Sequence, residues 1–368
     1  MTTARSESRA SARPAVAMLP VVANPYQQLL TRALADLGVQ VVHLARLPRA
    51  DWLRGNAGAV QVLHVHWLHQ LYMARFATPV QVIRFISWLE LARRLGYRLV
   101  WTAHNLLPHR RPLPPLHRAI RHWVVRRVDR IITHCRFASE ELQRLYPSAA
   151  PVSVIPHGSF AGVYSGQVTK EAARRELGLG SGDLVYLFLG NIARYKGLDR
   201  LVTAFRRMEG DRIRLVIAGR DRDHRLVRRL RAAATADRRI LLNAETIPDE
   251  RMQVWLAVAD VMVAPFVEIL SSGSVIAGMS YGLPVIAPAL GCLPELVTDQ
   301  AGSLYDPRDS DGLGRALESA RGWDVVGMGA AARAITDRLR WDEIAERTLA
   351  VYSSCGAGPR LRSTGRLR

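Results

Sequence analysis

Short apolar stretches alternate with helix-like stretches twice along the chain, and this alternation constrains the fold more than any other feature. In the first half, strands are expected at Val16–Val22, Val39–Leu44, Val60–Val65, Arg98–Ala103, Arg130–Thr133 and Val152–Ile155. After a break at 159–169, they are expected at Leu184–Leu189, Ile213–Ala218, Ile240–Asn243, Val261–Ala264, Val285–Ala287 and Gly302–Tyr305. Apolar strands separated by helices form parallel sheets that are covered on both faces. The sequence therefore predicts an α/β chain with two doubly wound sheets.

The repeated pattern divides the 368 residues into two domains with irregular ends. Residues 14–160 are predicted to form an N-terminal Rossmann-like domain and residues 161–330 a second one facing it across a cleft, with a helix at 331–352 closing the fold. The segments 1–13 and 353–368 are predicted to be disordered because they are rich in Arg, Ser and small residues. Residues 15–23 weakly resemble a signal peptide, but the proline and amphipathic stretch that follow favour a first strand.

Positive charge is concentrated in the first half. The chain carries 51 basic and 32 acidic residues, and residues 1–160 alone hold 21 arginines, no lysine and seven acids. Two explanations are open: the preference of a GC-rich genome for Arg on a solvated surface, and adhesion to an anionic surface such as a membrane. The stretches 76–95 and 116–132 interleave Arg with apolar residues, and Arg118, Arg121, His122 and Arg126 are expected near one helical face. No nucleic-acid-binding motif is present, so a nucleic-acid partner is not expected.

The three cysteines, Cys135, Cys292 and Cys355, are far apart and form no C-x-x-C pair. This spacing predicts neither a disulfide framework nor a zinc site and favours a reducing cytosol. No uninterrupted apolar stretch is long enough to cross a membrane. We therefore expect a cytoplasmic protein that is peripheral on the inner face of the plasma membrane.

One loop of the second half has the composition of a diphosphate site. Arg194 and Lys196 lie between Gly190 and Gly197, where a strand passes into a helix. The cations can neutralise a pyrophosphate and stabilise a leaving nucleoside diphosphate, and the glycines allow close approach of the backbone. Two solvated cations at a helix start are the structural alternative, although their charge opposes the helix dipole.

A second loop would reach the same phosphates from a neighbouring strand. Ser272, Gly273 and Ser274 begin an apolar helix, whose first N–H groups attract anions. Glu268 precedes them at the carboxyl end of a strand, where it could bind sugar hydroxyls or hold a hexose in line with its leaving phosphate. An ordinary helix cap and an exposed loop acid are the alternatives.

The order of these motifs resembles the GT-B glycosyltransferases, a superfamily that includes the retaining enzymes with an E-x7-E pattern. The resemblance covers most of residues 15–350. The segments that carry it are His64–Trp67, Trp101–His109, Val154–Gly158, Gly190–Asp199, Leu215–Gly219, Ala259–Pro265 and Gly282–Ala287. The second Glu of that pattern is absent, because Ala277 occupies its position. The chain is instead similar to a subgroup that adds glucuronic acid or mannose to lipid-linked repeat units of bacterial exopolysaccharides.

The resemblance implies transfer of a hexose or uronic acid from a UDP- or GDP-sugar to a hydroxyl of a saccharide. It also implies that this acceptor is linked to a lipid and belongs to the synthesis of surface polysaccharide or glycolipid. Residues 161–330 would bind the donor and 14–160 the acceptor. No obligatory metal is expected, since the cations hold the phosphates and Asp221-x-Asp223 is a weak metal motif in a polar loop. A nucleotide-sugar epimerase, a sugar phosphorylase and a non-catalytic GT-B binding protein remain alternatives.

The resemblance also assigns residues of the first half to the substrate site. His104 ends a strand and would lie near the donor sugar or the acceptor, where a neutral imidazole can donate a hydrogen bond or act as a base. The alternative for His104 is a strand-end His that only caps a loop. The alternative for His66 and Trp67, which could stack on a sugar ring of the acceptor, is a core aromatic residue with a partnered His. The further candidate substrate contacts are Asn24, Tyr26, His66, Trp67 and Asn105.

Overall fold

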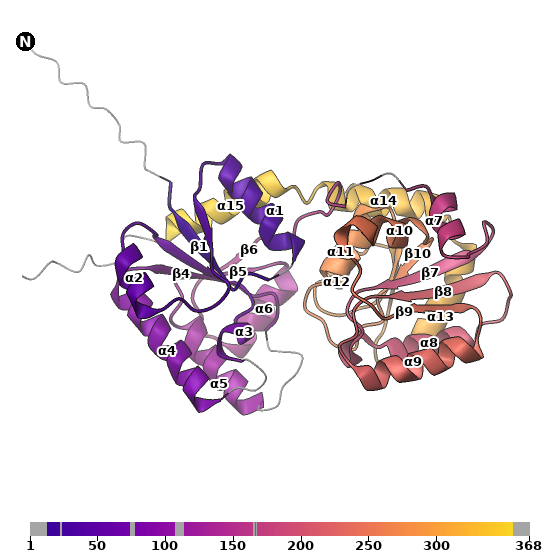
Figure 1. Cartoon of the computed structure of the whole chain (residues 1–368), viewed down its shortest axis with the longest axis horizontal. Coiled ribbons are helices and arrows are strands. Elements are labelled where there is room, and N and C mark those ends of the chain that lie inside the picture. Colours follow the sequence, from indigo (N-terminus) through magenta and orange to yellow (C-terminus); the bar gives the residue numbers. More distant parts are fainter. Residues whose placement is uncertain are drawn as a thin grey trace, which may run out of the picture. The chain divides into compact units, whose positions relative to one another are not determined.

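The computed structural model describes residues 13–22, 24–73, 78–106, 114–164, 166 and 168–355. The termini predicted to be disordered lie almost entirely outside these ranges, as do residues 107–109 of one motif. The chain forms two compact units: the first contains the described residues up to Thr133, 141–155 and those from Trp341 on, and the second contains 134–140 and 156–340. Each unit has one six-stranded parallel sheet with helices on both faces, as the alternation predicts (Figure 1).

The order of the strands in the first sheet differs from their order in the sequence. Its order is β2 (Val41–His43), β1 (Val16–Leu19), β3 (Val62–Val65), β4 (Arg98–Thr102), β5 (Arg130–Thr133) and β6 (Val152–Val154), with every neighbouring pair parallel. The helices are α1 (Pro25–Asp36), α2 (Ala50–Asn56), α3 (His69–Tyr72), α4 (Pro79–Arg94), α5 (Pro114–Val125), α6 (Arg136–Leu145) and α15 (Trp341–Ser354). The residues of α6 up to Glu140 belong to the second unit.

Strand β1 shows why these strands are apolar throughout. Val16 and Met18 contribute to a core shared with α1 and α15, whereas Ala17 and Leu19 contribute to a core shared with α4 and α5. All four residues are fully buried. Because successive side chains point to opposite faces and both faces are covered, no position of the strand tolerates water. The structure confirms the strand expected here.

The C-terminal stretch is divided between the two units. The sequence pattern predicts one closing helix at 331–352, but the structure has α14 (Val325–Asp337) in the second unit and α15 in the first. Helix α15 packs on α1, and the hydroxyl of Tyr352 lies 2.7 Å from Nδ1 of His64 in the core. A chain end thus completes the first unit.

Helix α5 corrects the prediction of a four-residue basic face. Arg118, His122 and Arg126 are exposed, but Arg121 is only 2% exposed. Its guanidinium lies 4.5 Å from the ring centre of Trp101, and its Nε and Nη1 have no hydrogen-bond partner among the described residues. The prediction is wrong for Arg121 because this position of the helix faces the sheet.

The second unit repeats the architecture with its own strand order. The order is β12 (Gly302–Tyr305), β11 (Val285–Pro288), β10 (Val261–Val263), β7 (Leu184–Leu189), β8 (Ile213–Ala218) and β9 (Ile240–Asn243), all parallel. Helices α7 (Lys170–Glu176), α10 (Met252–Ala257), α11 (Gly273–Ser280) and α14 lie on one face, and α8 (Leu198–Arg206), α9 (His224–Ala236) and α13 (Gly312–Ser319) on the other (Figure 1). The remaining elements are α12 (Leu293–Leu296) and the 3₁₀ turns η1 (Arg194–Lys196), η2 (Asp249–Arg251) and η3 (Ala320–Gly322).

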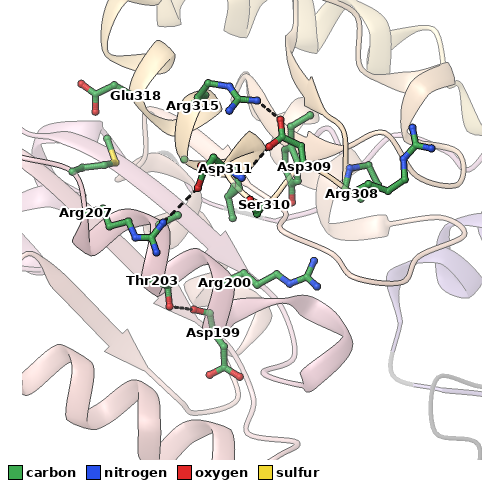
Figure 2. A pocket seen from close by; sticks show the side chains of 16 residues that line it. Asp199, Arg200, Thr203, Arg207, Arg308, Asp309, Ser310, Asp311, Arg315 and Glu318 are labelled. Atoms are coloured by element: carbon green, nitrogen blue, oxygen red, sulfur yellow. Dashed lines mark hydrogen bonds and ion pairs between the residues drawn. The ribbon is translucent and has the colours of Figure 1, made fainter.

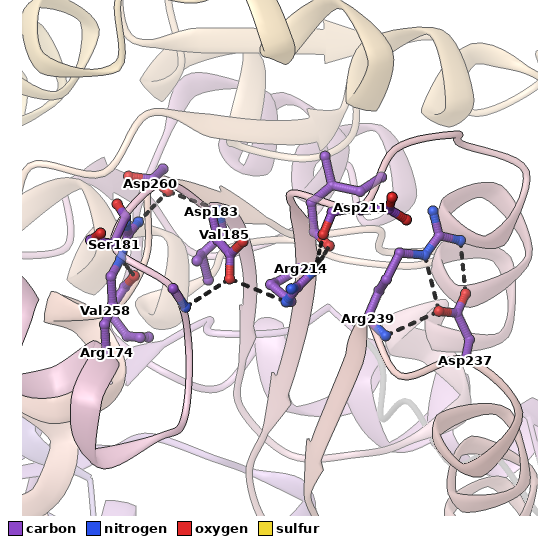
Figure 3. Close-up of polar contacts among 12 residues, drawn as sticks. Arg174, Ser181, Asp183, Val185, Asp211, Arg214, Asp237, Arg239, Val258 and Asp260 are labelled. Carbon is purple, nitrogen blue, oxygen red and sulfur yellow. Dashed lines mark hydrogen bonds and ion pairs between the residues drawn. The ribbon is translucent and has the colours of Figure 1, made fainter.

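Ion pairs stabilise the amino ends of the strands in this sheet (Figure 3). Asp260, just before β10, accepts hydrogen bonds from Nη2 of the buried Arg174 at 2.6 Å and from the N–H of Val185 at 2.8 Å. Lys170 Nζ lies 2.7 Å from the same carboxylate. A buried guanidinium requires such a partner, since an uncompensated charge is costly in the interior. This network leaves the opposite edge of the sheet for ligands.

The prediction that the cysteines form no disulfide is wrong. Cys135 and Cys292 are joined by a disulfide although they are 157 residues apart in the sequence. Spacing alone could not reveal the pair, because the fold brings the loop after β5 to the start of α12. Cys355 is a free, buried thiol, and burial raises its pKa to about 11. Within the described ranges, no helix combines the length and hydropathy needed to cross a bilayer.

Candidate functional site

Two loops at the carboxyl ends of β7 and β10 pack against each other in the second unit. Gly197 follows η1 with φ +72°, and a Cβ built on it would lie 1.9 Å from the carbonyl oxygen of Pro265. The N–H of Val267 donates to the carbonyl of Tyr195 at 2.9 Å. Only glycine permits this close approach at a positive φ. The structure therefore brings together the two loops that the sequence singles out.

The backbone of Gly190 lies beside the start of α11. Gly190 adopts φ +142°, and a Cβ built on it would be 3.9 Å from Oγ of Ser274. Ser272 caps the helix by accepting the N–H of Val275 at 3.4 Å, and its Oγ lies 3.1 Å from Oγ of Ser274. The start of this helix thus lies beside the backbone of Gly190, and helix N–H groups next to hydroxyls and a glycine suit an anion.

Lys196 places a buried cation in the same pair of loops. It is 8% exposed, and its Nζ lies 4.2 Å from the ring centre of Phe266 and 5.2 Å from that of Tyr195. Among the described residues no carboxylate pairs with this ammonium. Desolvation lowers its pKa from 10.5 to about 8. The aromatic rings compensate part of the cost of burial, and an anionic ligand would compensate more.

Arg194 and Glu268 are less buried than Lys196. The Arg194 side chain is 69% exposed, and its Nε donates to Oδ2 of Asp223 at 3.1 Å. Asp223 also caps α9, and Asp221 accepts the N–H of Asp223 at 2.8 Å. The two acids of the weak D-x-D motif therefore serve local structure. Glu268 is half-buried in the segment between Pro265 and α11.

His157, which belongs to the motif Val154–Gly158 of the resemblance, lies beside the candidate site although it is not among the predicted site residues. Its Nδ1–H donates to the carbonyl of Gly158 at 2.8 Å, which leaves Nε2 as an acceptor. A Cβ built on Gly273 would lie 3.5 Å from Nε2, so the imidazole lies against the start of α11. Burial, together with nearby His134, lowers its pKa to about 3. The ring is therefore neutral at physiological pH. The Pro156-His157-Gly158 motif is visible in the sequence, but the sequence does not show that His157 lies against α11.

A separate pocket of about 970 Å³ lies between α8, β12 and α13 (Figure 2). It contains four arginines and four acids, and several are paired with each other, for example Arg207 with Asp311 at 3.5 Å and Arg315 with Asp309. Their charges balance, so the pocket offers no net attraction for a diphosphate. None of the predicted site residues lines it.

The carboxyl edge of the first sheet brings together a cluster of aromatic and imidazole rings. His104 stacks on Trp67 at 4.4 Å between ring centres with an interplanar angle of 7°. Its Nε2 lies 3.2 Å from Nδ1 of His66, and the ring centres of His104 and Tyr26 are 4.9 Å apart in an edge-to-face arrangement. Asn24 accepts the N–H of Tyr26 at 2.9 Å and so caps α1. Five of the six predicted residues therefore form one cluster.

Burial separates the residues of this cluster that can contact a substrate from those that support them. His66 is 1% and Tyr26 3% exposed, whereas Trp67 and Asn105 are half-buried. Burial raises the pKa of Tyr26 above its ordinary value. His66 therefore orients His104 from within the core, and Trp67 is the ring of the pair with surface left for a sugar. Asn105 follows His104 directly. Among the described residues, no group of three or more His, Cys, Asp and Glu side chains could hold a metal ion.

Comparison with known proteins agrees with this architecture. Residues 9–159 match the model of Glycosyltransferase Family 4, and residues 183–320 match that of Glycosyl transferases group 1. A D-inositol 3-phosphate glycosyltransferase of Xylanimonas cellulosilytica is 29% identical over 93% of this chain and 82% of its own length.

Solved structures show the same fold. Sucrose-phosphate synthase from Thermosynechococcus elongatus has a TM-score of 0.73 at 18% identity and covers 93% of this chain and 99% of the synthase. Anabaena Alr3699/HepE in complex with UDP has a TM-score of 0.72 at 14% identity and covers 92% of this chain and 100% of that structure. With two matched family models that together span most of both sheets, the chain belongs to the group 1 and family 4 glycosyltransferases and has the GT-B fold.

Proposed function

We propose that this glycosyltransferase takes a hexose or uronic acid from a nucleoside-diphosphate sugar and transfers it to a hydroxyl of a saccharide acceptor. The observation that carries the proposal is the buried ammonium of Lys196, which no described carboxylate compensates, in loops that also contain Gly190 and the start of α11. A diphosphate would supply the missing negative charge and accept hydrogen bonds from the helix N–H groups. The Anabaena neighbour was solved with UDP, which supports a uridine or similar nucleotide.

The residues of the second unit divide the work of donor binding. Lys196 would face the phosphates as a desolvated point charge, and Arg194 would add a second cation from the surface. The hydroxyls of Ser272 and Ser274 would donate hydrogen bonds to the phosphate oxygens. Positive charge held in place before the reaction stabilises the leaving nucleoside diphosphate as its charge develops. We propose that these groups suffice without an obligatory metal ion. Glu268 would bind the hydroxyls of the transferred sugar and hold it in line.

The cluster of the first unit would bind the acceptor. Trp67 offers an aromatic face on which a sugar ring can stack, and His104 offers an imidazole that can accept a proton from the attacking hydroxyl. His66 and Tyr26 restrict the orientation of that imidazole from the core. Fixed orientation matters because general-base catalysis requires the accepting nitrogen within hydrogen-bond reach of the hydroxyl.

A ligand screen by thermal shift tests the donor assignment. UDP, GDP and ADP sugars are added to the protein, and any of them that binds the folded state raises the melting temperature by mass action. We expect a UDP- or GDP-sugar to do so, with the shift absent in Lys196→Met and unchanged by EDTA. Equal shifts in the wild type and the variant would overturn the assignment of the phosphate site.

Product analysis separates the proposed reaction from the alternatives in the same fold. A transferase releases free nucleoside diphosphate only when an acceptor is present. An epimerase changes the sugar with no release, a phosphorylase requires phosphate, and a non-catalytic protein changes nothing. Chromatography of the reaction mixture with and without acceptor therefore decides among them. Because the Xylanimonas relative is named for inositol 3-phosphate, that acceptor is assayed beside lipid-linked saccharides.

We propose further that the acceptor is carried by a lipid and that α4 contacts an anionic membrane. Val80 is 74% and Ile83 62% exposed on this helix, next to the exposed Arg84. A groove of about 330 Å³ beside them is lined mainly by apolar side chains, with arginines among its polar ones: Leu47, Pro48, Arg49, Ala50, Leu53, Arg84, Ser87, Trp88 and Leu91. Apolar side chains beside arginines suit the interface of an anionic bilayer.

Vesicle cosedimentation tests this surface. We expect the protein to bind vesicles that contain phosphatidylglycerol and to lose binding when Val80 and Ile83 are both changed to Asp. Turnover on a water-soluble acceptor should persist in that variant, since α4 holds none of the proposed donor-site residues. Unchanged sedimentation would exclude this face as the contact.

A further inference from the structure

The disulfide between Cys135 and Cys292 lies next to the segment that leads into the proposed phosphate site. Cys135 precedes α6, and Cys292 directly precedes α12. The N–H of Cys292 donates to the carbonyl oxygen of Leu270 at 2.7 Å. Leu270 is two residues before Ser272, the N-cap of α11. A covalent bond and one backbone hydrogen bond therefore connect Cys135 to the start of the proposed diphosphate-binding helix.

Direct backbone packing makes this connection stiff. Gly291 has φ +58°, and a Cβ built on it would lie 2.5 Å from the carbonyl oxygen of Leu270 and 2.6 Å from that of Ile269. No side chain separates the two segments, so a shift at 291–292 moves 269–270 with it. Leu270 is itself 8% exposed, which leaves it little room to adjust independently.

A second, non-covalent link joins the same two helices. The carboxylate of Glu295, in α12, accepts the N–H of Arg136 at 3.0 Å and that of Phe137 at 2.7 Å, both at the start of α6. This contact does not depend on the sulfurs and would keep Cys135 near Cys292 when the bond is reduced. Two thiols held close in this way can close the disulfide again without refolding.

We propose that Cys135 and Cys292 form a reversible thiol–disulfide site that controls the position of residues 269–274 and thereby donor binding; this inference rests on the proposed function of that segment. In reduction by a dithiol, one thiolate of the reductant attacks a sulfur of the disulfide and forms a mixed disulfide. This attack releases the other cysteine as a thiolate. The second thiolate of the reductant then attacks the reductant's sulfur in the mixed disulfide and displaces the remaining cysteine. The reductant leaves as a cyclic disulfide, and both cysteines gain a proton. Two electrons pass from the reductant to the protein. A small-molecule disulfide reverses the reaction.

Reduction removes the covalent anchor at Cys135 but changes no proposed ligand-binding side chain chemically. The segment before Ser272 then gains freedom, and a bound donor must restrict it again. We therefore expect reduction to raise the KM for the donor about fivefold or more and to change kcat less, a coupling of ordinary size between two sites. The effect should disappear in the double variant Cys135→Ser/Cys292→Ser, whereas Cys355→Ser should respond to reduction like the wild type.

Two readouts keep the inference separate from the proposed function. Amide hydrogen exchange of residues 268–274 is measured on oxidised and dithiothreitol-reduced protein without ligand, with the redox state verified by thiol alkylation and mass spectrometry. The KM for UDP-glucose, or for the donor found by the screen, is measured on the same samples. Faster exchange on reduction that is absent in the double Ser variant supports the coupling, even if no nucleotide sugar binds. Failure of every nucleotide sugar to bind would overturn the proposed function but not the coupling. Unchanged exchange and an unchanged KM in fully reduced protein would overturn the inference.

Discussion

The buried ammonium of Lys196 predicts that a single substitution stabilises the protein while it abolishes donor binding. Burial lowers the pKa of Lys196 from 10.5 to about 8. Since each pKa unit corresponds to about 1.4 kcal/mol, the protonated side chain costs the folded state about 3 kcal/mol near pH 7. The cation–π contacts with Phe266 and Tyr195 return part of this cost, roughly 1 kcal/mol. Lys196→Met should therefore raise the free energy of unfolding by about 2 kcal/mol at pH 7.

The pH dependence of this gain has a definite sign. The folded-state pKa of Lys196 is below the unfolded-state value, so the unfolded chain binds more protons between about pH 8 and 10.5. Wild-type stability attributable to this group is lowest below pH 8 and rises through that window as the folded state loses its charge. Lys196→Met lacks the group, and its advantage over the wild type should shrink as the pH rises above 8.

Urea denaturation at pH 7, 8 and 9 measures this difference, and titration with the donor nucleotide measures the functional side. Lys170→Met is the matched control, because the chain has only one other lysine and its ammonium is paired with Asp260. The control should not gain stability. Affinity of the wild type for the nucleotide should fall above pH 8, by up to about tenfold per pH unit, as Lys196 loses the charge that the phosphates require. A Lys196→Met protein that is less stable than the wild type at pH 7, or a pH-independent difference, would refute the reasoning.

Two further substitutions test the packing described above, again by urea denaturation. Gly197→Ala should lower the free energy of unfolding by about 3 kcal/mol or more, because the new Cβ meets a carbonyl oxygen. Gly178→Ala is the control: its φ is similarly positive but no atom lies within 4 Å, so it should cost only about 1 kcal/mol. Equal losses of stability in the two variants would contradict the close approach of the two loops. Arg121→Met should stabilise the first unit by about 1–3 kcal/mol, since it replaces a buried guanidinium whose Nε and Nη1 have no hydrogen-bond partner among the described residues. Arg118→Met on the exposed side of α5 should change stability by less than about 0.5 kcal/mol. Destabilisation by Arg121→Met would show that this charge has a partner.

Some parts of the candidate site could be predicted because they depend on local chemistry. Gly190, Arg194, Lys196 and the Ser272–Ser274 turn stand at strand-to-helix junctions, and parallel strands bring such junctions to one edge of a sheet. How deeply each of these side chains is buried could not be predicted. Arg194 and Lys196 are two residues apart, yet one is exposed and the other buried, because η1 turns them toward different surroundings. The position of His157 against α11 was equally invisible, since it depends on how the chain enters the second unit.

The sequence by itself determined the architecture of this protein. Short apolar strands, helices between them and glycines at the junctions specify two parallel sheets, because strands covered on both faces are mostly apolar and adjacent elements pack on each other. Only the tertiary structure decided which side chains are dry, which charges are paired and which distant segments touch. It buried Arg121 against Trp101, joined Cys135 to Cys292 and placed α15 on the first sheet. These outcomes depend on contacts between residues tens to hundreds of positions apart, and such contacts leave no periodic trace in the chain.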